Sequence, residues 1–136
     1  MAEGGTPDPA RYPQHPDQLL IDFAARVPDV RRAAVVTSDG VLVAVSDRAK
    51  PDDLQQLSAI TAGLISLAST TAQLLDTGAV IQALVTMKRG TLVIMAIDRE
   101  SSLAVLTTAT ADLDMVAYEM TMLVEESGGL FTPPAR

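Results

Sequence analysis

Few side chains in this sequence could take part in catalysis, and structural roles account for most of them. Paired carboxylates, which general acid–base chemistry uses, occur at three places: Asp52/Asp53, Asp112/Asp114 and Glu125/Glu126. Each pair lies at an end or on a polar face of a predicted helix, where capping or solvation explains it. Serine and threonine are plentiful, but no base stands ready to activate one of them. We therefore expect no active site and no enzymatic activity.

The sequence also offers little to bind a metal ion or a nucleotide cofactor. It contains no cysteine, and its single histidine, His15, lies in a Pro- and Gly-rich stretch that predicts a solvated tail over residues 1–16. Asp39 precedes Gly40 and suits a tight turn better than a metal site, because its neighbours supply no second ligand. Neither a GxxxxGK[ST] nor a GxGxxG motif is present. We expect no metal and no cofactor.

Length and composition limit the size of the domain, the type of core and the class of binding partner. A chain of 136 residues suits one domain, and with two Phe, two Tyr and no Trp its core must be aliphatic. The net charge of −7 argues against a nucleic-acid-binding protein, which needs a basic face.

Apolar periodicity and turn residues predict the order of the elements. A helix is expected over residues 17–27, followed by strands over 32–37 and 41–46 that a Ser38-Asp39-Gly40 hairpin joins. Three more strands, over 80–87, 91–97 and 102–108, are joined by short links and should be antiparallel. A last helix is expected over 112–127 before Gly128-Gly129.

Between the first two strands and the last three lies a long helix that begins near Pro51 and is uncharged from Leu54 to Leu75. Its many polar residues and acidic flanks argue against a membrane span. A bulky stripe is predicted to pack on the sheet: Leu57, Ile60, Leu64, Leu67, Thr71 and Leu74. A second stripe has small side chains that allow another backbone to approach: Ala59, Ala62, Gly63, Ser66 and Ser69. We expect this second stripe to pair with another copy of the chain; the alternative is that its polar groups are simply solvated.

These elements predict an α/β fold, an α-β-β-α-β-β-β-α sandwich. Five antiparallel strands form the sheet, with helices on both faces, and the nearly continuous apolar runs over 84–87 and 92–97 indicate a sheet covered on both sides.

Several segments resemble the roadblock (dynein light-chain type) family. They are Phe23-Ala24-Ala25-Arg26-Val27-Pro28-Asp29-Val30, residues 34–44 (AVVTSDGVLVA), residues 57–64 (LSAITAGL), residues 111–120 (ADLDMVAYEM) and Leu130-Phe131-Thr132-Pro133. The chain is similar to the bacterial roadblock proteins of conservon operons, which lie beside a sensor-kinase-like protein and a small Ras-like GTPase. The resemblance spans residues 17–134 and departs from the family pattern at Asp114, where Gly is expected. It implies a domain over 17–131 with tails over 1–16 and 132–136.

The resemblance implies a roadblock/longin-like fold with one long helix on one face of the sheet and two helices on the other. It further implies a homodimer in which the long helices pair and the third strands join two sheets. The implied function is that of a non-catalytic, cytoplasmic regulator or adaptor of a small Ras-like GTPase, which a partner could recruit to the inner face of the membrane. Some family members accelerate GTP hydrolysis by arranging the partner's own residues. Two alternatives stay open: a scaffold that links a membrane sensor-kinase-like protein to other partners, and a small-molecule sensor.

Two sets of surface residues follow from this reading. The expected dimer interface has two parts. Four of its residues lie on the long helix, namely Ala59, Ala62, Gly63 and Ser66. The others lie in the following strand segment from Val80 to Val85, namely Val80, Ile81, Gln82 and Leu84. The expected GTPase-binding surface comprises Arg48, Lys50, Gln55, Gln56 and Ser66, where the two cations could attract an acidic partner. As an alternative, Arg48 and Lys50 are ordinary loop charges.

Overall fold

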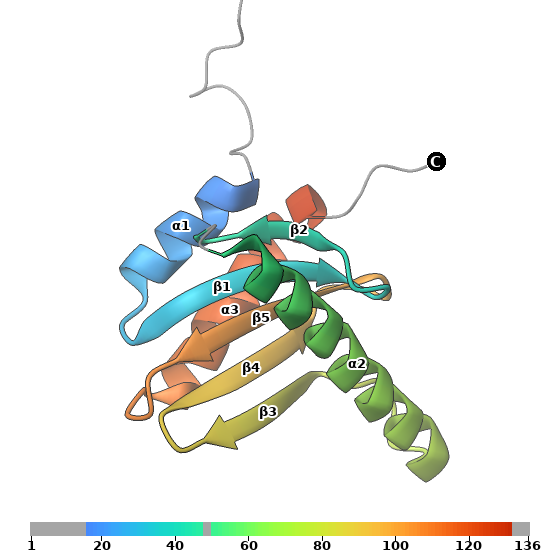
Figure 1. Cartoon of the computed structure of the whole chain (residues 1–136). Coiled ribbons are helices and arrows are strands. Elements are labelled where there is room, and N and C mark those ends of the chain that lie inside the picture. Colours follow the sequence, from blue (N-terminus) through green and yellow to red (C-terminus); the bar gives the residue numbers. More distant parts are fainter. Residues whose placement is uncertain (1–15, 48–49, 132–136) are drawn as a thin grey trace, which may run out of the picture.

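All predicted helices and strands are present, in the predicted order (Figure 1). The structure is a computed structural model that describes residues 16–47 and 50–131. The predicted boundaries agree with the structure to within about two residues. The elements are α1 (Pro16–Arg26), β1 (Val30–Thr37), β2 (Leu42–Val45), α2 (Pro51–Leu75), β3 (Gln82–Met87), β4 (Gly90–Ala96), β5 (Ser101–Thr107), α3 (Leu113–Ser127) and the 3₁₀ helix η2 (Gly128–Phe131).

The five strands form one antiparallel sheet in the order β2-β1-β5-β4-β3, so that β2 and β3 are its edges. Helix α2 crosses one face of the sheet, while α1 and α3 cover the other (Figure 1). The central strands β4 and β5 are buried along almost their whole length, as the continuous apolar runs predict. The predicted fold class is confirmed.

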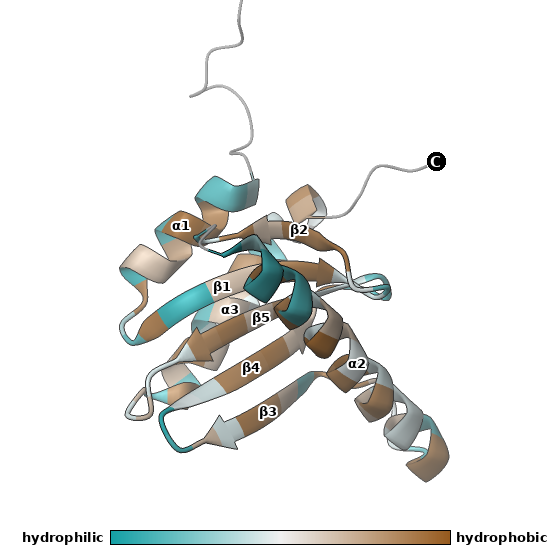
Figure 2. Cartoon of the chain, in the orientation of Figure 1, coloured by the Kyte–Doolittle hydropathy of each residue, from teal (hydrophilic) through white to brown (hydrophobic). Residues whose placement is uncertain are grey.

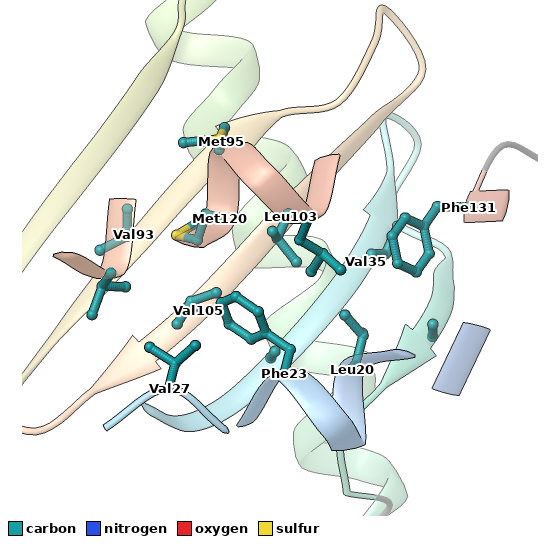
Figure 3. Packing of buried hydrophobic residues seen from close by; sticks show 14 residues of the cluster. Leu20, Phe23, Val27, Val35, Val93, Met95, Leu103, Val105, Met120 and Phe131 are labelled. Carbon is teal, nitrogen blue, oxygen red and sulfur yellow. The ribbon is translucent and has the colours of Figure 1, made fainter. Parts of the chain in front are cut away.

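The main core lies between the sheet and the pair α1 and α3. Phe23 of α1 and Met120 of α3 pack over Val35, Leu103 and Val105 of the central strands (Figure 3). These five side chains are fully buried. The core is aliphatic apart from its phenylalanine rings, as the composition predicts.

Local signals explain where several elements turn or end. Gly40 adopts φ +88° in the β1–β2 hairpin, a conformation that glycine adopts without steric cost. The carboxylate of Asp112 accepts the backbone N–H of Met115 at 3.2 Å and caps the start of α3. At the other end of α3, the chain continues as η2 and brings Phe131 into the main core.

The sheet-facing side of α2 is not the predicted one. The bulky stripe was expected to pack on the sheet, but Ile60, Leu67 and Leu74 are exposed. The side chains that α2 buries are Leu54, Ser58, Thr61, Ala62 and Ala72. A Cβ atom at Gly40 would lie 3.6 Å from the Ala59 Cα and 3.9 Å from the Ala62 Cβ. The small side chains therefore allow the hairpin of the same chain to approach α2. Of the bulky stripe, Leu64 packs against the sheet as predicted, whereas Ile60, Leu67 and Leu74 point away from it.

By length and composition, α2 could cross a membrane. In this structure, however, its buried side packs against Val36 and Val45 near its start and against Ile94 further along. This is the position of a helix in a folded sandwich.

Candidate partner-binding surface

The outer side of α2 is an exposed apolar surface. Ile60, Leu67 and Leu74 are 54%, 69% and 80% exposed, and Gly63 lies among them on the helix. We call these four residues the outer stripe. Figure 2 shows that the first turns of α2 are hydrophilic and that hydrophobic residues are frequent from its middle onward, where the helix extends past the strand ends. Bulky apolar side chains that are grouped and exposed in this way mark a surface for association.

The outer stripe carries a repeat that sequence reasoning overlooked. Ile60, Leu67 and Leu74 are seven residues apart, so that they fall nearly on one line along the helix. The signal was visible in the sequence, but these three residues were assigned to the sheet side. Gly63 belongs both to the outer stripe and to the predicted interface. The predicted interface residue Ala62 is buried within the chain, whereas Ala59 and Ser66 are exposed on one flank of α2.

The edge strand β3 presents a second associating surface. Ala96 donates its backbone N–H to the Ile81 carbonyl at 3.3 Å, so odd-numbered positions of this segment direct their backbone groups toward β4. Alternation then places the N–H and C=O groups of Gln82 and Leu84 at the open edge. Ile81 is 77% exposed and Leu84 is 46% exposed, so this edge is both apolar and able to form hydrogen bonds.

The opposite edge of the sheet is partly closed. Strand β2 has four residues, and its Val45 donates the backbone N–H to the carboxylate of Asp17 in α1 at 2.9 Å. An edge amide that already has an acceptor is a poor template for another strand. The edge of β3 is therefore the better surface for pairing.

The predicted GTPase-binding residues are only partly brought together. Lys50, Gln55 and Gln56 are exposed at the start of α2, while Ser66 lies about 15 Å further along the helix at 1.5 Å per residue. Arg48 lies outside the described residues. Next to Gln55, residues of α2 and of the β1–β2 hairpin line a half-open hollow of about 530 Å³. Its lining is mainly apolar: Gly40, Val41, Leu42, Pro51, Leu54, Gln55 and Ser58.

Structural roles also account for polar groups that could have done chemistry. Asp112 caps α3, and the described cation–carboxylate pairs are Arg26–Glu119 at 2.7 Å and Arg32–Asp47 at 3.1 Å. Within residues 16–47 and 50–131, no three His, Asp or Glu side chains gather in a way that could hold a metal ion. His15 lies outside these ranges.

Comparison with known proteins gives a consistent result for family and fold. The model of the family described as "Roadblock/LC7 domain" matches residues 16–107. Two solved Roadblock/LC7 domains from Streptomyces avermitilis are similar to the chain. One is 30% identical with a TM-score of 0.78 and covers 83% of this chain and 94% of its own. The other is 37% identical with a TM-score of 0.66 and covers 81% and 95%.

A more distant likeness concerns the fold alone. The MglB structure of Myxococcus xanthus has a TM-score of 0.76 at 15% identity, covering 85% of this chain and 93% of that one. No curated protein sequence matches the chain.

Proposed function

The chain belongs to the Roadblock/LC7 domain family, and from this membership we propose that it is a homodimeric, non-catalytic regulator or adaptor of a small Ras-like GTPase in a bacterial signalling system. The observation that carries the proposal is the uncharged outer stripe of α2 together with the open edge of β3. A chain with these two surfaces gains stability by pairing with a copy of itself.

The dimer we propose uses both surfaces at once. Pairing of two β3 edges would satisfy the outward N–H and C=O groups of Gln82 and Leu84. Pairing of two α2 helices would remove Ile60, Leu67 and Leu74 from water, at a gain of about 25 cal/mol per Å² of apolar surface. A two-fold arrangement joins like surfaces and closes the assembly.

This proposal revises the interface expected from the sequence. Gly63, Ile81, Gln82 and Leu84 stay in it, and the outer stripe adds three bulky residues. Ala62 contributes little because it is buried within its own chain. Ala59, Ser66 and Val80 would flank the contact.

We place the GTPase contact at the start of α2 and the adjoining β1–β2 hairpin. Lys50 supplies positive charge, and the hollow beside Gln55 can accept an apolar side chain of a partner. Charge complementarity with an acidic switch region would raise the association rate more than the affinity. This contact surface lies at the opposite end of α2 from Leu74.

The proposal that this chain has no catalytic role is supported by the structural roles of its polar groups. The carboxylate of Asp112 is used in capping, and the paired carboxylates at Asp52/Asp53 lie exposed in the first turn of α2, where a negative charge is favourable. Any effect on GTP hydrolysis would then arise from arranging the partner's own residues. We propose a cytoplasmic location, with recruitment to the membrane by a partner.

The resemblance implies a neighbouring gene for a small Ras-like GTPase. The test is to measure single-turnover GTP hydrolysis by that GTPase with and without the full chain, and binding of the chain to its GDP and GTP-analogue forms. A faster rate supports a regulator, and an unchanged rate with tight binding supports the scaffold reading. Absence of binding to either form would refute the GTPase proposal. Lys50→Glu should weaken binding, while Lys88→Glu in the β3–β4 turn is a matched control that removes the same charge away from the proposed contact.

A further inference from the structure

A second and larger hollow lies on the sheet side of α2, opposite the outer stripe. It measures about 910 Å³ and is half open. Its walls are the C-terminal half of α2, the connection to β3 and the turn between β4 and β5. Because pairing through the outer stripe uses the other side of α2, this hollow would stay open in the proposed dimer.

The floor of the hollow includes the hydroxyl group of Ser102. Ser102 lies on the α2 side of β5, in register with Val36 and Ala96. It is only 7% exposed, and no hydrogen bond of its hydroxyl is found among the described residues. This hydroxyl group is therefore available to hydrogen-bond to a ligand in the hollow.

The wall formed by α2 favours a cationic group. Asp76, which ends the helix, has no side-chain partner among the described residues and lines the hollow. The last turn of α2 contains no basic residue, so the partial negative charge of the helix C-terminus is not neutralised there. An ammonium group would be stabilised both by the Asp76 carboxylate and by the partial negative charge of the helix C-terminus.

The opposite wall favours an anionic group. Arg99 lies in the turn between β4 and β5 and lines the same hollow. Among the described residues, both ion pairs and all side-chain hydrogen bonds of arginines involve residues other than Arg99. A free guanidinium is well suited to bind a carboxylate. The lining also includes apolar surface at Ile65, Ala72 and Val80 and the carboxamide of Gln73. Asp98 lies beside Arg99 on the same wall, and its carboxylate accepts the Glu100 backbone N–H and the Ser101 hydroxyl.

We propose that this hollow binds a small zwitterion with an aliphatic body, of the amino-acid or dipeptide class. Its ammonium group pairs with Asp76 and the end of α2, and its carboxylate pairs with Arg99. Its body packs on Ile65 and Ala72 and brings a polar group to Ser102. The volume falls within the range of about 300–1,000 Å³ that ligand pockets usually have. The proposal does not depend on the GTPase partner.

The experiment titrates the ¹⁵N-labelled full chain with L-leucine and with the dipeptide Ala-Leu and follows amide chemical shifts. We expect saturable shifts at residues that line the hollow with at least one of these probes. N-acetylation or C-terminal amidation of that probe removes one charge and should weaken binding about tenfold or more. Lack of a saturable shift with both probes would overturn the proposal, as would equal affinity for the blocked forms.

Three variants locate the site. Asp76→Asn and Arg99→Gln each remove an exposed charge without touching the core, and each should weaken binding about tenfold. Arg31→Gln, on β1 and away from the hollow, is the matched control and should bind normally. Unchanged affinity in both Asp76→Asn and Arg99→Gln would show that the probe binds elsewhere.

Discussion

Replacement of Gly63 by arginine tests helix pairing with little risk to the fold. A Cβ atom built at Gly63 meets nothing within 4 Å, so a larger side chain enters open space in the isolated chain. Glycine inside a helix costs about 0.8–1.0 kcal/mol relative to alanine, and arginine is close to alanine. The variant chain should therefore be as stable as the original or gain roughly 0.5–1 kcal/mol.

The same substitution should be strongly unfavourable in the dimer. A two-fold interface brings in two guanidinium groups, one from each protomer, among the apolar side chains of the outer stripes. Burying an unpaired charge costs several kcal/mol. Even a penalty of about 2 kcal/mol for each group sums to about 4 kcal/mol, which raises the dimer Kd about a thousandfold.

Sedimentation velocity over a concentration series measures this change, and urea denaturation checks the fold. Gly129→Arg is the matched control, because a Cβ at Gly129 also meets nothing within 4 Å and the residue lies in η2, away from α2. We expect a dimer for the original chain and for Gly129→Arg, and a monomer for Gly63→Arg. A folded Gly63→Arg chain with an unchanged Kd would refute pairing through the outer side of α2.

Three further predictions concern the edge, the core and a close contact. Leu84→Pro should keep the fold but prevent dimerisation, because the Leu84 N–H faces the open edge. Val85→Pro should instead disrupt the pairing with β4 and unfold the chain. Circular dichroism measures the fold of each variant, and light scattering measures its oligomeric state. Phe23→Ala should lower the free energy of unfolding by about 3–5 kcal/mol in urea, and a loss below about 1 kcal/mol would contradict the described core. Gly90→Ala should lower Tm, since its Cβ would lie 2.7 Å from the Thr107 carbonyl oxygen and such crowding costs about 1–3 kcal/mol; an unchanged Tm would be inconsistent with this packing.

Much of the fold could be predicted because its signals are local. The Asp39-Gly40 turn and the start of α3 at Asp112 each depend on residues within one turn of the chain. The order of the elements follows from apolar periodicity together with the turn residues between the elements. The candidate interface stays a prediction: Gly63 and Leu84 are exposed, as an interface requires, whereas Ala62 is buried within its own chain.

The error on α2 has a physical cause. Periodicity shows which side chains share a side of a helix, but not which side meets the sheet. For α2, the close approach of Gly40 to Ala59 and Ala62 decided that question, and this contact joins residues about twenty positions apart. The sequence pattern contains no signal for this contact.

The sequence by itself determined the elements, their order, the aliphatic nature of the core and the scarcity of reactive groups, because backbone preferences and side-chain chemistry act over a few residues. The tertiary structure alone decided which side of α2 faces outward, that Asp17 occupies the β2 edge, and that Asp76, Arg99 and Ser102 line one hollow. These features depend on how closely distant segments can pack, and packing distances are set only once the sheet and its helices are assembled.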